Sequence, residues 1–240
     1  MTRIIFADDS QYIREAYRRI LETQAHFQIV GVAEDGEEAV RLAKELNPDV
    51  AILYIRMPKL TGIEAATQIT STNPEMGIII ISAYDDLNYV KELLKDGPKG
   101  RAYILKTSLD DIGELIRVVE AVSDVGTVLD PELVQKLVRL MVSKETPGIS
   151  DLNATEREVY ELLVGGYEDA EIARTLRLTQ EDIKEVTSSA TSKLGIPDTG
   201  GLEKRSQAVE HFINRFTQVL YESCLLYTSP SPRDRSSSRM

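Results

Sequence analysis

The sequence has few of the residues that build disulfide frameworks and metal centres. Its 240 residues include one cysteine, two histidines and no tryptophan. One cysteine cannot form an internal disulfide, and so few Cys and His side chains argue against a zinc site. No apolar run approaches the roughly 18 residues of a membrane span, and the N-terminus lacks the apolar core of a signal peptide. We therefore expect a soluble, cytoplasmic, globular protein with no membrane partner.

The sequence also has fewer basic than acidic side chains, with 28 Lys and Arg against 39 Asp and Glu. The formal net charge is −11, which argues against non-specific adhesion to DNA or to anionic lipid, although it leaves room for a local basic face. A chain of this length can form two domains, each with its own core.

The composition changes abruptly at Cys224. Residues 224–234 resemble, over eleven residues in order, the conceptual translation of a transposon adapter used in sequencing libraries. A disordered Ser/Pro/Arg-rich terminus is the plainer interpretation. We expect residues 224–240 to be a sequencing-adapter artefact and exclude them from the fold. The sole cysteine is then not native.

The first 122 residues alternate between apolar runs and segments with helical periodicity. This alternation predicts an α/β, doubly wound, parallel five-stranded domain with right-handed crossovers. The predicted strands are residues 3–7, 28–33, 50–54, 77–82 and 101–105.

Polar side chains follow the predicted strands at their carboxyl ends, the edge at which open α/β sheets bind ligands. They are Asp8 and Asp9 after the first strand, Tyr54 ending the third, and Ser82 and Lys106 after the fourth and fifth. Alone, each has a simpler interpretation as a helix cap, a turn residue or a surface charge. The ordered set across separate strand ends favours a functional site.

Together with Met57-Pro58, Gly62, Ala83 and Tyr103, these residues make the segment resemble the receiver domain of two-component response regulators. The resemblance implies that Asp9 is the direct ligand of a Mg²⁺ ion and that Asp8 acts through water. It further implies that Lys106 pairs with a phosphoryl group and Ser82 donates to it, while Tyr103 rotates inward as a switch. A sensor histidine kinase is the implied partner.

Tyr54 departs from that pattern because it stands at the phosphoacceptor position, where Asp is expected. A phenol is neutral at pH 7, so it offers neither an anionic metal ligand nor a carboxylate nucleophile. We therefore expect weakened Mg²⁺ binding and no aspartyl phosphate. Two accounts stand. Either the receiver is a genuine phosphorylation-independent form, or a single-base error has converted an Asp codon to a Tyr codon.

Residues 123–150 form a predicted linker. Apolar residues recur at helical spacing from Gly126 to Ser143, and Asp130-Pro131 stands near the start of this expected amphipathic helix. A polar hinge with Pro147-Gly148 follows.

Residues 151–223 are predicted to form an all-α, four-helix domain with a helix-turn-helix. Gly165-Gly166 stops its first helix, and its last helix is expected at about Lys204–Tyr221. The domain resembles the DNA-binding domain of the LuxR/NarL/FixJ type through Thr155-Glu-Arg-Glu-Val159, Ala170-Glu-Ile-Ala173, Leu178-Thr179, Ile183-Lys184 and Lys193-Leu194-Gly195. The implied partner is the DNA major groove, bound as a homodimer. The implied base-edge residues are Lys184, Glu185 and Ser188, with Lys193, Lys204 and Arg205 on the phosphate backbone.

The charge of this domain works against DNA binding. Residues 151–222 carry 14 acidic and 8 basic side chains, a net charge of −6. Because neutralisation of phosphates supplies most non-specific affinity, a monomer should bind weakly. The first hypothesis is a DNA-binding transcriptional regulator of a two-component pathway. The alternative is a protein-interaction regulator with a degenerate receiver and little or no DNA binding. No nucleophile–base pair indicates an enzyme.

Overall fold

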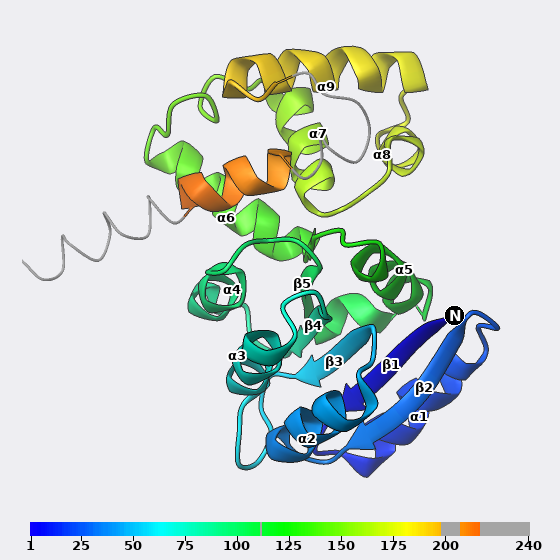
Figure 1. The fold of residues 1–240 in the computed structure, drawn as a ribbon. Helices are drawn as coiled ribbons and strands as arrows, with labels where there is room; N and C mark the ends of the chain where they lie inside the picture. The colour runs from blue at the N-terminus through cyan, green and yellow to red at the C-terminus, as the bar shows by residue number, and fades with distance from the viewer. Residues whose placement is uncertain (111, 198–206, 217–240) are drawn as a thin grey trace, which may run out of the picture.

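The computed structural model describes residues 1–110, 112–197 and 207–216. Figure 1 shows a half that contains the β-sheet, with a helical half stacked on one end of it. The sheet is parallel and six-stranded in the order β2-β1-β3-β4-β5-β6. Its strands are β1 Thr2–Ala7, β2 Phe27–Ala33, β3 Val50–Tyr54, β4 Gly77–Ser82, β5 Arg101–Leu105 and β6 Val128–Leu129.

Five helices cover the two faces of this sheet. One apolar cluster joins α2, α3 and α4 to the side chains on one face, and a second joins α1 and α5 to those on the other. The parallel strands are therefore buried on both sides, as their continuous apolar runs predict. The helices are α1 Gln11–Glu22, α2 Gly36–Leu46, α3 Gly62–Thr72, α4 Leu87–Leu94 and α5 Ile112–Ser123, and a 3-10 turn, η1 Lys106–Asp110, precedes α5.

The sixth strand corrects the predicted count of five. Val128 and Leu129 pair in parallel with Ala102 and Tyr103 of β5, inside the segment expected to be a linker helix. The helix α6, Pro131–Ser143, begins only after them, with Asp130 as its N-cap. The early part of the apolar pattern thus belongs to the sheet. The Pro at the first helical position marks the true start, because its fixed φ suits a first turn.

The helical half packs around α6. It comprises α7 Ala154–Val164, α8 Asp169–Leu176, α9 Gln180–Leu194 and a helix over residues 207–216. Tyr160 of α7 meets Phe212 edge-to-face at 6.2 Å between ring centroids. The described helix 207–216 lies within the predicted last helix, whose two ends fall outside the described residues. No helix in the described part of the chain is long and apolar enough to cross a bilayer.

Candidate functional site

The predicted site residues gather at the carboxyl edge of the sheet, where β1, β3, β4 and β5 end side by side. Tyr54 ends β3 beside a close turn. The Gly62 N–H donates to the Ile55 carbonyl at 2.9 Å, and a Cβ on Gly62 would stand only 2.5 Å from the Tyr54 carbonyl oxygen. Gly62 therefore lets the loop after β3 fold back tightly enough to fix the position of Tyr54.

The acidic pair splits into a buried and an exposed carboxylate. Asp8 is 2% exposed and accepts a hydrogen bond from the Ser10 N–H at 2.8 Å, whereas Asp9 is exposed. Burial raises the pKa of Asp8, and the neighbouring Asp9 charge adds to this effect. Arg14 donates to the Asp8 and Asp9 carbonyl oxygens at 2.8 and 3.1 Å, which holds the loop in place.

Tyr54 fills the space between the acidic pair and Lys106. Burial raises the pKa of its phenol, and the nearby Asp8 charge raises it further, so the ring stays neutral at physiological pH. The Lys106 ammonium lies 5.4 Å from the Tyr54 ring centroid, in the range of a cation–π contact. The lysine that would meet a phosphoryl group in a receiver therefore faces an aromatic ring here.

This edge offers an incomplete ligand set for Mg²⁺. The metal prefers several oxygen ligands, usually including carboxylates. Asp8 and Asp9 supply two carboxyl groups, and the neutral phenol of Tyr54 supplies no third. No group of three His, Cys, Asp or Glu side chains that could hold a metal ion occurs within the described residues.

Ser82 and Tyr103 form one hydrogen-bonded unit with Tyr84. The Ser82 hydroxyl donates to the Tyr84 carbonyl and accepts from the Tyr84 N–H, both at 2.9 Å. The Tyr103 hydroxyl donates to the same carbonyl at 2.9 Å, and its side chain is fully buried. Burial raises the pKa of Tyr103 to about 12. Tyr103 is thus held inside the fold at the turn after β4, its role as a switch stays a prediction, and the Arg56 guanidinium carbon lies 4.0 Å from the Tyr84 ring centroid.

The segment after β6 reaches this edge, which sequence reasoning did not foresee. A cavity of about 420 Å³ is lined by Ser82, Lys106 and Glu132, among others. Asp130 is fully buried, caps α6 through the Glu132 N–H at 2.9 Å, and accepts from the Leu105 N–H at 2.9 Å. The residue before Lys106 is therefore bonded directly to the cap of α6. No sequence spacing reveals this contact, because Leu105 and Asp130 meet only through the β5–β6 pairing.

The helix-turn-helix lies in the helical half and is formed by α8 and α9. The side chains of Thr179 and Asp182 form a capping box that starts α9, and Arg177 makes the turn before it in the left-handed region, at φ +57°. Lys184, Glu185 and Ser188 are all exposed. Figure 1 shows α9 on the side of the helical half that faces away from the sheet. The three predicted base-edge residues thus share an open helix, and Arg174 and Arg177, which sequence reasoning passed over, add exposed positive charge beside it.

Lys193, a predicted phosphate contact, forms an ion pair within the helical half, unlike the exposed Lys184. Its ammonium pairs with the Glu156 carboxylate at 2.6 and 2.8 Å, and Ser189 donates to the same carboxylate at 2.7 Å. Glu156 is 3% exposed, and its partners Lys193 and Ser189 lower its pKa to about 2. The Lys193 charge is therefore engaged within the domain. Lys204 and Arg205 lie outside the described residues.

The structure thus joins a parallel α/β half, with polar groups at the carboxyl edge of its sheet, to a helical half that contains a helix-turn-helix. Residues 4–120 match the response regulator receiver domain family. The chain is 31% identical over 224 residues to the transcriptional regulatory protein DegU of Brevibacillus brevis, covering 86% of this chain and 91% of that protein. It is 33% identical over 208 residues to the transcriptional regulatory protein LnrK of Bacillus subtilis (strain 168), covering 82% of this chain and 93% of that protein.

A solved structure extends the likeness of fold to nearly the whole chain. The RcsB response regulator of Salmonella typhimurium aligns with a TM-score of 0.50 and 24% identity, over 93% of this chain and 98% of that one. The protein belongs to the response regulators of the LuxR/NarL type.

Proposed function

We propose that this chain is a DNA-binding transcriptional regulator whose receiver is not phosphorylated at position 54. The observation that carries the DNA-binding part is the open face of α9, where Lys184, Glu185 and Ser188 are exposed on a capped helix. The DegU and LnrK relatives, both named transcriptional regulatory proteins, support the same role. The chain would bind the major groove as a homodimer and have no enzymatic activity of its own.

The input part of the proposal rests on Tyr54. Its phenol is neutral and lies under Lys106, so a sensor histidine kinase partner would find no carboxylate to phosphorylate there. Mg²⁺ would bind only weakly through Asp8 and Asp9, and no step of the proposed function passes through the metal. Residues 1–122 would form the receiver, 123–150 the linker and 151–223 the output domain. Residues 224–240, an adapter artefact by this proposal, lie outside the described residues.

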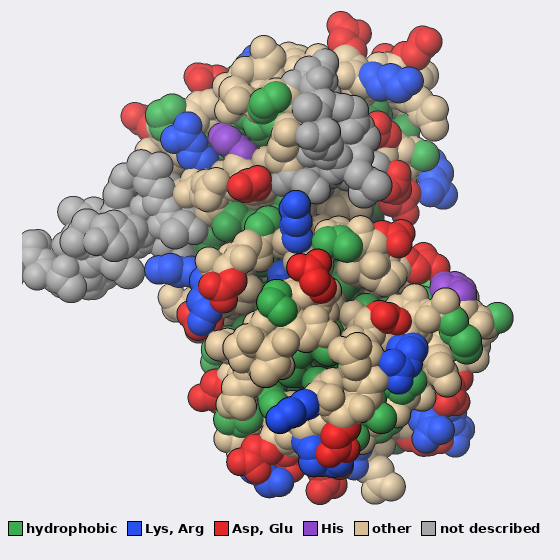
Figure 2. Space-filling view, viewed as in Figure 1, with side chains coloured by type: hydrophobic (Ala, Val, Ile, Leu, Met, Phe, Trp, Pro, Cys, Tyr) green, Lys and Arg blue, Asp and Glu red, His purple; other side chains and the backbone are tan. Residues whose placement is uncertain are grey.

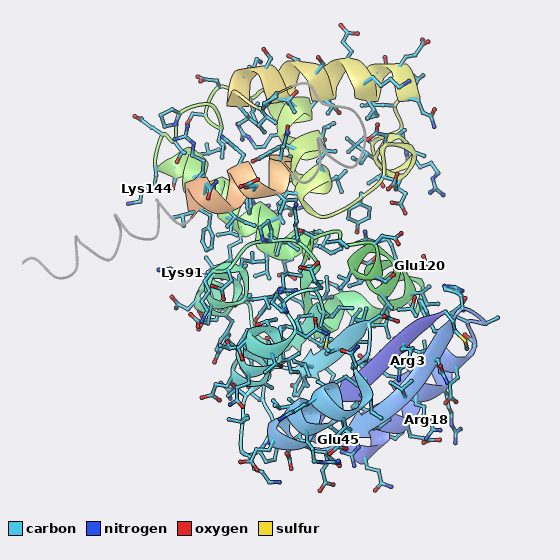
Figure 3. All side chains as sticks on the ribbon, viewed as in Figure 1. Arg3, Arg18, Glu45, Lys91, Glu120 and Lys144 are labelled. Carbon is cyan, nitrogen blue, oxygen red and sulfur yellow. The ribbon has the colours of Figure 1, made fainter. Side chains whose placement is uncertain are left out.

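A gel-shift titration against genomic fragments tests the output. We expect selective, salt-sensitive binding, because phosphate contacts release counterions. Lys184→Ala should cost about 1–3 kcal/mol of binding free energy and relax the selectivity among fragments, because Lys184 is a proposed base-edge contact. Arg18→Ala is the matched control. Arg18 lies on α1 far from α9 (Figure 3) and pairs with exposed Glu22 at 2.8 Å, so this variant should bind as the parent does.

One observation favours a second function. The output domain has a net charge of −6, which the pairing of Lys193 with Glu156 leaves unchanged, and Figure 2 shows acidic side chains along the outer edge near α9. A protein-interaction regulator would have such a surface. Absence of binding to any fragment, even at concentrations at which the chain is a dimer, would support this alternative and reject the first proposal.

A further inference from the structure

A second cavity opens at the amino edge of the sheet, where the strands begin, and not at the carboxyl edge that holds Tyr54. It is lined by the C-terminal part of α3, by the segments that lead into β4, β5 and β6, and by Glu210 of the helical half. Its volume of about 800 Å³ is in the range of cavities that bind small molecules. We call it the amino-edge cavity.

A buried cation lies in the lining of the amino-edge cavity. Among its described charged residues, only Arg101 is buried, at 8% exposure. Arg101 Nη1 donates to the Met76 and Gly100 carbonyls at 2.9 and 3.1 Å, and Nη2 donates to the Pro74 carbonyl at 3.1 Å. These bonds use three of the five N–H groups of the guanidinium. The other two have no hydrogen-bond partner within the described residues.

No carboxylate neutralises this buried charge by an ion pair within the described residues. Burial lowers the pKa of Arg101, and the charges of Asp96 and Glu75 oppose that effect, but a guanidinium stays charged in either case. A buried charge without a counterion is unfavourable. The free N–H groups of Arg101 therefore favour an anionic group of a ligand, which they can meet with charge-assisted hydrogen bonds.

The rim of the amino-edge cavity has the opposite character. Asp96 and Glu75 are exposed there, and neither forms an ion pair within the described residues. Lys95 is paired with Glu92 at 2.6 Å. The other charged rim residues, Lys99 and Glu210, carry one charge of each sign. The rim thus keeps an excess of acidic charge above the buried Arg101.

The hydroxyls of α3 add hydrogen-bond acceptors to this lining. Thr67, Thr70 and Ser71 donate to carbonyls of the preceding turn of their own helix, at 3.0, 2.9 and 2.7 Å. Because their protons are used in these bonds, the oxygens present lone pairs to a ligand. Such a surface suits N–H groups and does not suit a simple oxyanion such as phosphate.

We propose that the amino-edge cavity binds a small zwitterion of the amino-acid or short-peptide class. The ligand carboxylate pairs with the free N–H groups of Arg101, and the ligand ammonium pairs with Asp96 and Glu75. A simple anion would meet the rim carboxylates, and a simple cation would meet the guanidinium, so only a ligand with both charges satisfies both parts of the lining. The proposal is independent of the proposed DNA binding.

Isothermal titration calorimetry of the full chain tests the site. The probes are leucine, glutamate and lysine as free amino acids and as their alanyl dipeptides. Each is compared with its C-terminal amide, which lacks the α-carboxylate, and with its N-acetyl form, which lacks the ammonium. We expect at least one zwitterion to bind, and both of its derivatives to bind about tenfold more weakly or worse, because each loses a charged contact. Binding by the amino acid alone or by the dipeptide alone identifies the source of the ligand.

Two sets of variants assign the contacts. Arg101→Gln removes the buried cation and should weaken binding of the zwitterion by about tenfold or more. Because Arg101 also bonds to backbone carbonyls, its folding is checked by thermal melting. The double variant Glu75→Gln with Asp96→Asn changes only exposed side chains, and in it the N-acetyl form should bind as well as the zwitterion. Glu22→Gln, which removes an exposed carboxylate on α1, is the matched control and should bind as the parent does.

Three results would overturn the proposal. The first is that no probe binds to the parent chain. The second is that the amide and N-acetyl forms bind as tightly as the zwitterion. The third is an unchanged affinity for the zwitterion in the double variant or in a folded Arg101→Gln.

Discussion

At the scale of single residues, Tyr54 decides what the receiver can do. Asp8 is buried, Asp9 is exposed and the Lys106 ammonium lies 5.4 Å from the Tyr54 ring centroid. Under the proposed function, what position 54 lacks is a carboxylate that could accept a phosphoryl group.

Tyr54→Asp should therefore restore phosphoryl acceptance. With acetyl phosphate and Mg²⁺, intact-mass spectrometry should find no adduct on the parent and a labile phosphoryl adduct on the variant, because the new carboxylate can attack phosphorus. Tyr54→Phe, which changes the side chain without supplying a carboxylate, is the control and should stay unmodified. A phosphoryl adduct located in this pocket of the parent would refute the account of Tyr54 given above.

Glu156 should make the output domain sensitive to acid. Its pKa is lowered from 4.5 to about 2 in the folded protein, so its stabilisation is complete above pH 4.5 and is lost as the pH falls toward 2. The full shift corresponds to about 3 kcal/mol. Because Lys193 is 38% exposed and water screens the pair, we expect about 1–2 kcal/mol.

Urea unfolding of Glu156→Gln at pH 7 and pH 3 measures this contribution. The variant should be less stable than the parent at pH 7, and the difference should shrink at pH 3, where Glu156 is largely protonated in the unfolded chain but still largely ionised in the folded one. Glu22→Gln, which removes an exposed ion pair, should differ little from the parent at either pH. A gap that stays constant with pH would show that the ionised carboxylate contributes nothing.

At the scale of elements, Asp130 connects the sheet to α6. Asp130→Ala leaves the buried Leu105 N–H without its partner and removes the α6 cap, so we expect a loss of about 2–4 kcal/mol. The exposed α4 cap offers a matched control, since Asp86→Ala loses exposed hydrogen bonds from the Asn88 N–H and side-chain amide, and we expect a loss of about 1 kcal/mol. Urea unfolding compares the two. Equal losses would mean that the Leu105 bond adds no stability.

Most elements could be predicted from the sequence because their patterns are local. The β3, β4 and β5 bounds match the expected residues, since their apolar runs end at a clear polar or Pro/Gly signal. β6 was missed because two apolar residues ahead of Asp130-Pro131 fit a helical pattern as well as a strand. Val128-Leu129 becomes a strand because the edge of β5 is free to pair with it. A short stretch of sequence around residues 128–129 carries no information about that distant edge.

The same reasoning explains which parts of the site escaped prediction. Residues at strand ends could be assembled in advance, because parallel strands bring their carboxyl ends to one edge. Glu132 at the cavity and Arg117 at the α7–α8 turn could not, since each contact joins segments whose mutual placement the sequence does not encode locally. The roles of Ser82, Tyr103 and the α9 residues stay predictions.

At the scale of the whole molecule, the two halves are joined through more than one segment. α6 runs between them, Lys136 of α6 pairs with Asp85 after β4, and Arg117 holds the α7–α8 turn. Figure 1 shows α9 on the side of the helical half that faces away from the sheet. At the junction, Asp130 is bonded to Leu105, which lines the pocket, and Arg117 is bonded to the α7–α8 turn.

The β6 strand also bears on how the receiver avoids pairing with other chains. A receiver cut after Ser123 would lose β6 and leave the β5 edge, with Ala102 and Tyr103, open to an intruding strand. We expect this fragment to self-associate in sedimentation velocity, whereas the full chain, whose β5 edge is paired, should not associate by this route. By pairing the β5 edge, the segment that leads out of the sheet should also limit strand-to-strand association between chains.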